Sequence, residues 1–412
     1  MKPEPKIAFI TPLYLPAKFS GSGVVIQQLA TELARRGYDC SVITSDGLTT
    51  RAWYDPICGK RIEENFEIIK GVKVYRLPCR RILSFFYLAM VRYFRFLLPR
   101  ALFNKLELLY SGPNLVGLTN LLQEEKFDII HSSPFPTYSN KQAVDSAARL
   151  APRPKLMIMP CFHSFLPDYH NPELGKILTK ADLIHVFTNA EKEDLQKIFR
   201  LPDEKFAIVP LFLDLSKMTR PEKSEVARFK ERFNLIDKKI ILFAGSKIHL
   251  KGIFTLTEAI KKLHEKDPTY ALITIGNGNP GWEKYKKKTN PAFLIDLGYV
   301  SEKQKEVAFG ACDIFCLPSI CESFGLVYLE AWHKRKPVIG ANIPVVRELI
   351  TNAQGGLLVE FGNEEALAET IQKLARSPRL AEELGQSGYR TLTLEYNLLK
   401  VLPKFENFLK NV

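Results

Sequence analysis

The chain of 412 residues has few cysteines and no sequence pattern that would pair them. Its seven cysteines are odd in number and no two form a C-x2-C pair, so neither a disulfide framework nor a zinc site is indicated. No D-x-D sequence occurs, and residues 1–6 are polar with no visible signal peptide. We therefore expect a protein that binds no metal and that fits a reducing cytoplasm.

Acidic residues are absent from residues 70–105, where aromatic residues alternate with nine basic ones: Lys70, Lys73, Arg76, Arg80, Arg81, Arg92, Arg95, Arg100 and Lys105. The apolar run at residues 82–91 is shorter than the ~20 residues that span a bilayer. A basic aromatic helix is suited to the lipid interface, so we predict an anionic membrane surface as a partner and a peripheral location. A core helix with a solvated basic edge is an equal alternative. Nucleic acid is not the expected partner, because no recognisable nucleic-acid motif accompanies the stretch.

Strand-like and helical segments alternate in both halves of the chain. Apolar runs of strand character occur at residues 6–11, 40–44, 127–131, 156–159, 183–188, 206–213, 239–244, 272–275, 293–297, 314–317 and 337–341. The chain is too long for one core and fits two domains of about 200 residues each. We predict an α/β fold of two doubly wound, Rossmann-like domains that face across a cleft, at residues 1–215 and 216–390.

The most informative stretch holds two carboxylates, Glu322 and Glu330, eight positions apart. On one continuous helix these side chains would lie about 80° apart, so the pattern favours Glu322 on a loop and Glu330 inside a helix at residues 325–334. The helix N-terminus then lies between them, where free N–H groups and the positive end of the helix dipole favour an anion. Eight residues at ~1.5 Å each span at most ~12 Å, which suits a diphosphate flanked by two sugars.

This string, E-S-F-G-L-V-Y-L-E preceded by L-P-S and followed by A-W-H-K-R-K-P-V-I, resembles the E-x7-E signature of family 4 glycosyltransferases. These are retaining, nucleotide-sugar-dependent enzymes of the GT-B fold. The resemblance implies that Glu330 binds the donor ribose, that Glu322 faces the transferred sugar as a catalytic residue, and that the backbone of Phe324, Gly325 and Leu326 holds the diphosphate. It also implies an acceptor-binding first domain, a donor-binding second domain, and a last helix within residues 391–412 that crosses back onto the first domain.

Two glycine loops supply further candidate phosphate ligands. Gly21 and Gly23 precede a helix predicted at residues 24–36 and resemble the family's glycine loop, which closes over the donor phosphates. A glycine turn at residues 245–252 carries Lys247 and Lys251, whose ammonium groups are point charges suited to a pyrophosphate. The family commonly has Arg where this chain has Ser246, so either Lys247 substitutes for it or the contact is missing.

His163 is the second predicted catalytic residue. It follows the strand at residues 156–159, a position at which a family His contacts the transferred sugar. A structural loop histidine is an equal alternative.

Residues 276–281 formally match G-x-G-x-x-G, and Asp296 lies twenty positions beyond Gly276, as in a dinucleotide fingerprint. Pro280 within the motif, and the motif's position midway through the second half, argue against that interpretation. The stretch resembles instead the family's glycine turn beside the donor. Tyr299 and Val300 follow the next strand, where relatives cradle the nucleobase, and Tyr299 is placed to stack on it.

The sequence therefore predicts a retaining glycosyltransferase, a hexosyltransferase that needs no cofactor. Its expected partners are a nucleoside diphosphate sugar and a glycan or lipid-linked acceptor. The alternatives are a GT-B epimerase or phosphorylase, and a basic membrane or nucleic-acid adaptor without transferase activity.

Overall fold

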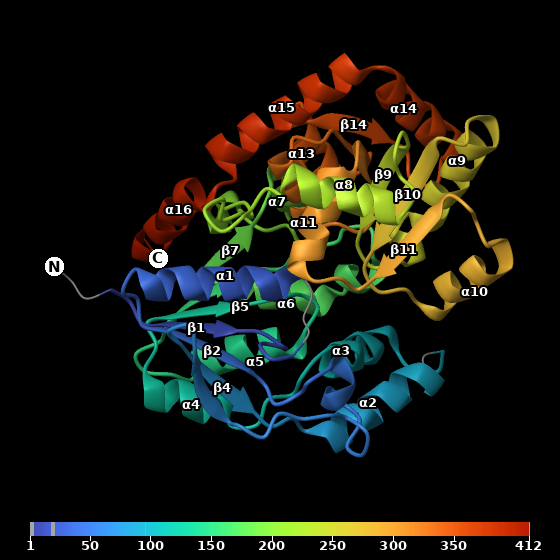
Figure 1. The fold of residues 1–412 in the computed structure, drawn as a ribbon. Helices are drawn as coiled ribbons and strands as arrows, with labels where there is room; N and C mark the ends of the chain where they lie inside the picture. Colours follow the sequence, from blue (N-terminus) through green and yellow to red (C-terminus); the bar gives the residue numbers. More distant parts are fainter. Residues whose placement is uncertain (1–3, 18–20, 95, 412) are drawn as a thin grey trace. The chain divides into compact units, whose positions relative to one another are not determined.

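The computed structural model describes residues 4–17, 21–94 and 96–411 of the chain (Figure 1). The chain divides into two compact units, an N-terminal unit (Met1–Val209 with Leu402–Val412) and a C-terminal unit (Pro210–Val401). The sequence placed the division at residue 215 and the return of the chain within residues 391–412.

The N-terminal unit is built on an eight-stranded sheet in the order β3-β4-β2-β1-β5-β6-β7-β8. The strands are β1 (Ile7–Ile10), β2 (Cys40–Ser45), β3 (Phe66–Ile69), β4 (Val72–Leu77), β5 (Ile129–Ser132), β6 (Lys155–Ile158), β7 (Leu183–Val186) and β8 (Phe206–Ile208). Every neighbouring pair is parallel except β3 and β4. β1 and β5 are adjacent, and the strand order runs outward from them in both directions, so they mark a topological switch point.

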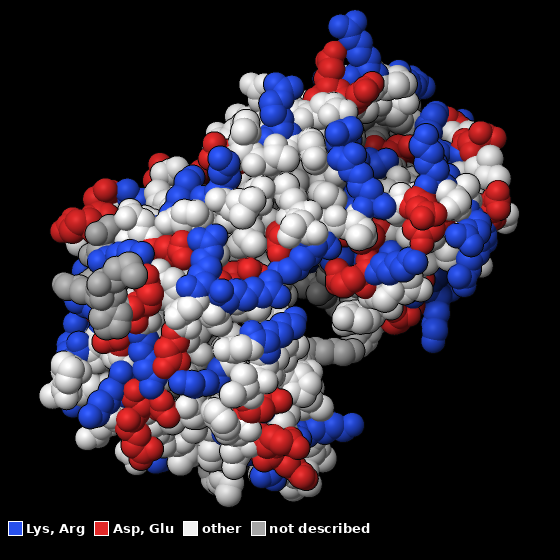
Figure 2. Space-filling view, turned by 60° about the vertical axis from the view of Figure 1, so that its left-hand side comes forward, with Lys and Arg blue, Asp and Glu red and all other residues white. Residues whose placement is uncertain are grey.

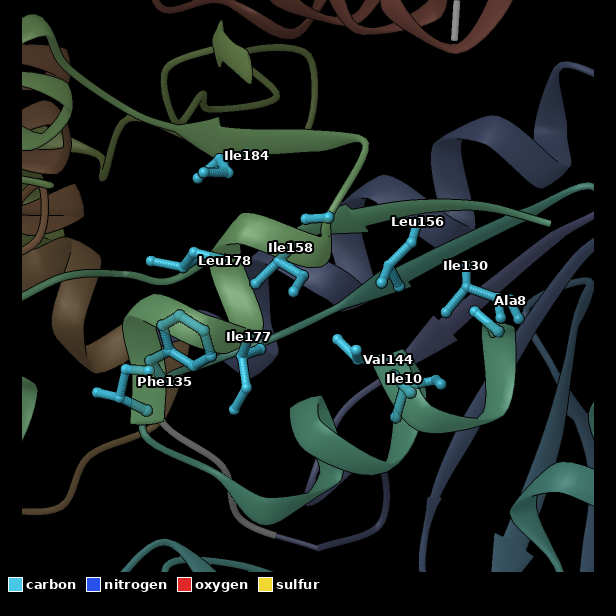
Figure 3. Packing of buried hydrophobic residues seen from close by; sticks show 14 of the residues in the cluster. Ala8, Ile10, Ile130, Phe135, Val144, Leu156, Ile158, Ile177, Leu178 and Ile184 are labelled. Atoms are coloured by element: carbon cyan, nitrogen blue, oxygen red, sulfur yellow. The ribbon is translucent and has the colours of Figure 1, made fainter. Parts of the chain in front are cut away.

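Helices α1 (Gly21–Arg35), α2 (Arg81–Phe94), α3 (Arg100–Tyr110), α4 (Leu118–Glu125), α5 (Tyr138–Ala147), α6 (Pro172–Lys180) and α7 (Asn189–Phe199) belong to the same unit. One face of the sheet packs on α5 and α6, where Ile130 and Ile158 face Val144 and Ile177 in a fully apolar core (Figure 3). The central strands are buried on both faces, as their continuous apolar runs predict for a parallel sheet.

The C-terminal unit has a six-stranded, all-parallel sheet in the order β11-β10-β9-β12-β13-β14. Its strands are β9 (Lys239–Ala244), β10 (Tyr270–Ile275), β11 (Leu294–Gly298), β12 (Ile314–Leu317), β13 (Val338–Ala341) and β14 (Gly356–Val359). Its helices are α8 (Lys223–Arg232), α9 (Ile253–Lys266), α10 (Pro280–Thr289), α11 (Glu302–Ala311), α12 (Leu326–His333), α13 (Pro344–Ala353), α14 (Glu364–Arg376) and α15 (Pro378–Glu395). Here the switch point lies between β9 and β12. The predicted α/β class, with two parallel-sheet domains, is therefore confirmed.

Helix α16 (Leu398–Asn411) begins in the C-terminal unit, and from Leu402 onward its residues belong to the N-terminal unit. There Phe405 packs against the rings of His131 and His185 at centroid distances of 5.9 and 5.3 Å. The end of the chain is thus part of the core of the N-terminal unit.

The basic stretch at residues 70–105 is only partly a basic surface. Lys73 binds Asp39 at 2.9 Å, Arg76 is buried against Glu67, and Arg81 is buried against Asp46. Lys70, Arg80, Arg92, Arg100 and Lys105 remain exposed, and Arg95 lies outside the described residues. On the face shown in Figure 2, Lys and Arg side chains are interspersed with Asp and Glu, so the net charge of +13 is not gathered there into one continuous basic area.

Among the residues that the structure describes, no helix is both long enough and apolar enough to cross a membrane.

Candidate active site

Two loops meet at the switch point of the C-terminal sheet. Residues 245–252 follow β9 and residues 318–324 follow β12, and these neighbouring strands are parallel, so both loops leave the same edge of the sheet. The Ile320 N–H donates to the Leu250 carbonyl at 3.0 Å. Gly252 adopts a φ of +73°, and a Cβ there would lie 2.2 Å from the Pro318 carbonyl oxygen, so only glycine allows this approach. The two loops are therefore held together by a backbone hydrogen bond and by close packing at Gly252.

Lys251 and Glu322 form an ion pair across this junction. Lys251 ends the short 3-10 helix η4 (His249–Lys251), and its Nζ lies 2.6 Å from Glu322 Oε1 and 2.6 Å from the Cys321 carbonyl. The Lys251 side chain is 22% exposed and the Glu322 side chain 11% exposed. The structure thus brings together two residues that the sequence assigned to separate tasks, one to the phosphates and one to the transferred sugar.

The N-terminus of α12 begins beside this pair, as the sequence predicts. Gly325 precedes the helix with a φ of +97°, and a Cβ there would lie 2.5 Å from the Tyr328 ring. Tyr328 donates to the Leu317 carbonyl at 2.7 Å, and Phe324 is buried, so both sides of the turn are anchored. No side chain caps the start of the helix, whose first N–H groups have no intrahelical acceptor.

Glu330 lies one turn into α12 and is largely buried. Its Oε1 accepts from Lys305 of α11 at 2.8 Å, whereas its buried Oε2 has no hydrogen-bond partner among the described residues. Burial raises the pKa of Glu330, against the opposing effect of Lys305. Lys305 is a residue that sequence reasoning missed, since only the packing of the chain brings it to Glu330.

Lys247 does not have the environment predicted for a phosphate ligand. Its side chain is 1% exposed, is ion-paired with Asp296, and donates to the Gly276 carbonyl at 2.6 Å. Burial lowers the pKa of Lys247, although Asp296 favours the charged form. The geometry therefore counts against the substitution of Lys247 for the usual Arg, because its ammonium is already bound inside the domain.

Asp296 is the centre of this buried network. Besides Lys247, it accepts from Trp282 Nε1 at 2.9 Å and from Lys286 Nζ at 2.5 Å. Burial alone would raise the pKa of Asp296, but these donors together lower it. Because the Asp296 carboxylate already accepts from these donors, it is not available to a ribose hydroxyl. This removes the main support for a dinucleotide fingerprint at this turn.

The glycine turn itself has a packing role. Gly276 has a φ of +117°, and a Cβ there would lie 2.1 Å from the Gly245 carbonyl oxygen, so Gly276 lets the turn approach the loop after β9. The argument from Pro280 against a helix start is wrong, because α10 begins at that residue with Asn279 as its cap. Tyr299, 70% exposed, and Val300 follow the edge strand β11, which β10 separates from β9. Their contact with a nucleobase stays a prediction.

In the N-terminal unit, Gly21 and Gly23 lie within the first turn of α1, whereas the sequence predicted a loop. Glycine is a poor helix former, but Gly23 is buried and packing overrides its propensity. Their role towards phosphate stays a prediction.

His163 follows β6 in a loop whose conformation depends on a residue that the sequence did not single out. Glu191, at the start of α7 and 1% exposed, accepts from the Phe162 and Phe187 N–H groups at 2.7 Å each. The His163 ring contacts Tyr169 edge-on at 5.2 Å. The contact of His163 with a sugar stays a prediction.

No group of three or more His, Cys, Asp or Glu side chains that could hold a metal ion occurs within residues 4–17, 21–94 and 96–411.

Two family models match the chain: a glycosyl transferase 4-like domain at residues 20–211 and glycosyl transferases group 1 at residues 225–391. The glycosyltransferase TuaC of Bacillus subtilis is 24% identical over 403 residues, which is 95% of both chains. A trehalose synthase of Pyrococcus horikoshii is 28% identical over 244 residues, 54% of this chain. This second match spans only 58% of that relative's length.

Solved structures share the fold over nearly the whole chain. Sucrose-phosphate synthase from Thermosynechococcus elongatus has a TM-score of 0.74 at 18% identity, over 99% of this chain and 98% of that one. Anabaena HepE in complex with UDP-glucose has a TM-score of 0.73 at 16% identity, over 99% and 100%. With both family domains present in order along the chain, the protein belongs to the family 4 glycosyltransferases of the GT-B fold.

Proposed function

We propose that the enzyme transfers a sugar from a nucleoside diphosphate sugar to an acceptor hydroxyl with retention of the anomeric configuration. One observation carries the proposal: the Lys251–Glu322 pair lies beside the uncapped start of α12, at the switch point between β9 and β12. In open α/β sheets, ligands bind outside the carboxyl ends of the strands at such a point. The site thus combines a cation, a carboxylate and free N–H groups where a ligand is expected.

The diphosphate is assigned to the start of α12. Helix N-termini bind anions through unpaired N–H groups and the helix dipole. A diphosphate there would lie next to the Lys251 ammonium, which Glu322 and the Cys321 carbonyl already hold in place. Because the leaving group gains negative charge during transfer, a preorganised cation and N–H donors favour the transition state. The proposal gives this task to protein groups and requires no metal.

The nucleoside is assigned to the side of α12 that carries Glu330. Its Oε2 has no hydrogen-bond partner among the described residues, and an unpaired buried acceptor is costly. A ribose hydroxyl would supply the missing donor once the carboxylate turns toward the bound nucleotide. Since HepE binds UDP-glucose with the same fold, UDP sugars are the first donors to test.

Retention requires a defined path for the acceptor. A double displacement would need a carboxylate on the opposite face of the sugar, and we assign none among the described residues. We therefore propose attack from the face that the leaving group departs from, with Glu322 stabilising positive charge on the sugar.

A lipid-linked acceptor is favoured over a soluble glycan by the exposed apolar surface of the N-terminal unit.

A thermal-shift screen against UDP, GDP and ADP sugars tests the donor assignment. A ligand that binds only the folded protein stabilises it by about 2.7 kcal/mol at 100 times its Kd. We expect one nucleotide class to raise the Tm of the wild type and to do so much less for Lys251→Met. Equal shifts in both proteins would contradict the role of Lys251.

Product analysis with a labelled donor tests the reaction. We expect a glycoside with the anomeric configuration of the donor, formed only when acceptor is present. An inverted product would contradict retention. An epimerised donor formed without acceptor, or a sugar phosphate formed with phosphate, would indicate an epimerase or a phosphorylase instead.

A further inference from the structure

Helix α2 carries its large apolar side chains on the side that faces solvent. Ile82, Phe86 and Tyr93 are 66%, 60% and 74% exposed, and at 100° per residue they lie within about 40° of one another around the helix. The residues that α2 buries are Arg81, Ser84 and Val91. A core helix would show the opposite arrangement, so the alternative of a core helix with a basic edge does not describe α2.

This apolar area extends past the end of the helix. More than half of the exposed large hydrophobic residues in the described part of the chain fall within residues 82–102: Ile82, Leu83, Phe85, Phe86, Met90, Tyr93, Phe94, Phe96, Leu97 and Leu102. We call the area formed by these residues the α2 surface. Contiguous exposed apolar areas of this kind mark sites of interaction with a protein or a membrane.

Four exposed cations beside the α2 surface lack acidic partners among the described residues. Arg80, Arg92, Arg100 and Lys105 are exposed, and within the described ranges none of them forms an ion pair. The other basic side chains nearby, Lys73, Arg76 and Arg81, are all bound to acids. The surface therefore presents uncompensated positive charge together with aromatic side chains.

A groove of about 540 Å³ opens at the N-terminal end of α2. The residues that line it include the apolar Ile82, Leu83 and Phe86 and the basic Arg61 and Arg80. Apolar walls beside two cations fit an amphiphile with an anionic head group. The groove and the α2 surface thus favour the same kind of ligand.

We propose that the α2 surface binds an anionic lipid bilayer, with its aromatic side chains among the head groups and its arginines near the lipid phosphates. A second copy of the chain is the weaker candidate, because a symmetric contact would bring unpaired cations of the same sign together. Aromatic residues interleaved with Arg match the interfacial region, where each cation contributes attraction to anionic lipid. This inference does not depend on the donor or the reaction.

Co-sedimentation of the full-length protein with vesicles tests the proposal. We expect binding to phosphatidylcholine vesicles that contain phosphatidylglycerol, much weaker binding without phosphatidylglycerol, and weakening as salt shortens the Debye length. Phe86→Ser and Tyr93→Ser should each weaken binding about tenfold, through lost apolar contact. Arg80→Gln and Arg92→Gln should each weaken it about fivefold at low salt.

Matched controls use residues of the same kind in the C-terminal unit. Ile236→Ser removes a side chain that is 57% exposed, and Lys288→Gln removes an exposed cation. Both should leave vesicle binding unchanged. Equal effects of the control and α2 variants, or no binding to anionic vesicles, would overturn the proposal. Concentration-dependent dimers that Phe86→Ser dissolves would identify a second copy as the occupant instead. The assay contains no nucleotide sugar, so its failure is distinguishable from failure of the donor assignment.

Discussion

The two units differ in whether the cations beside their proposed binding surfaces are paired with acids. In the C-terminal unit, three lysines near the proposed donor site are each bound to an acid: Lys247 to Asp296, Lys251 to Glu322 and Lys305 to Glu330. In the N-terminal unit, four exposed cations beside the α2 surface, Arg80, Arg92, Arg100 and Lys105, lack acidic partners in the described part of the chain. Its core also holds the hydrogen-bonded ring pair of His131 and His185. The net charge of +13 does not reveal this difference, because it does not show which cations are paired with acids.

Exposure also distinguishes the two lysines of the loop after β9. Lys247 and Lys251 are four positions apart, yet the first is 1% exposed and the second 22% exposed. An ammonium at the surface of a site is able to exchange a carboxylate partner for a phosphate at small cost, whereas a buried one is not. Exposure and pairing therefore predict which lysine serves the ligand.

Glu322→Gln should have the largest effect. If Glu322 stabilises charge on the sugar, kcat should fall about 100-fold to 1,000-fold with little change in KM for the donor. Steady-state kinetics with the donor found by thermal shift measures this. Glu302→Gln is the matched control, because Glu302 also binds a lysine, Lys305, but is 84% exposed. A Glu322→Gln enzyme with the full transfer rate would remove Glu322 from the mechanism.

The contrast between the two lysines predicts opposite phenotypes. Lys247→Met leaves Asp296 without one of its buried donors and should lower the free energy of unfolding by ~3 kcal/mol. Lys251→Met should change stability by less than ~1 kcal/mol and weaken donor binding. Urea unfolding and donor titration of both variants measure the two quantities. A Lys247→Met variant that is as stable as the wild type but binds the donor more weakly would contradict this distinction between the two lysines.

The histidine pair predicts that the N-terminal unit loses stability as the pH falls. His131 Nε2 and His185 Nδ1 are 3.1 Å apart, and burial lowers the pKa of His185 to about 4 and that of His131 as well. The unfolded chain binds these protons with a pKa near 6.5, so their contribution is complete above about pH 6.5 and decreases as the pH falls toward 4. For His185 the loss should reach ~2 kcal/mol by pH 5.

Hydrogen exchange at pH 7 and pH 5, corrected for the intrinsic rate, measures this loss strand by strand. Amides of β5 and β7 should lose protection in the wild type and lose less in His185→Gln, which lacks one of the two titrating rings. An equal loss in His185→Gln would show that the histidine pair is not the cause.

Glu330→Gln should have the smallest effect of the four. Replacing the charged acceptor by a neutral one weakens its hydrogen bond to the ribose. The donor KM should therefore rise about tenfold. We expect kcat to change little, because the ribose is remote from the bond that breaks. A loss of kcat at unchanged KM would place Glu330 in the chemistry and not in nucleoside binding.

Much of the fold follows from the sequence because buried parallel strands read as continuous apolar runs. β9 and β12 have the predicted limits, and the predicted loop, helix start and next strand all follow β12. Strand β3 gives no such signal because it is an edge strand with half-exposed side chains. Helix α2 shows that periodicity alone does not predict burial, because an amphipathic pattern does not reveal which face of the helix points outward.

The site was predictable where its residues are close in sequence, and not where they meet through the fold. Glu322, Gly325 and Glu330 lie within one short string, which fixes their relation to the helix start. Lys247 was predicted as a phosphate ligand or as a missing contact, and its buried pairing with Asp296, 49 residues away, gave no signal in the sequence. Lys305 gave no signal for the same reason, because Glu330 is 25 residues away.

A crystal structure of the enzyme with UDP tests the central claim most directly. The account predicts diphosphate oxygens within ~3 Å of the Gly325 and Leu326 N–H groups and of Lys251 Nζ, with Glu330 on the ribose. A nucleotide bound away from the start of α12, or bound there with Glu322 and Glu330 both turned away from it, would contradict the account.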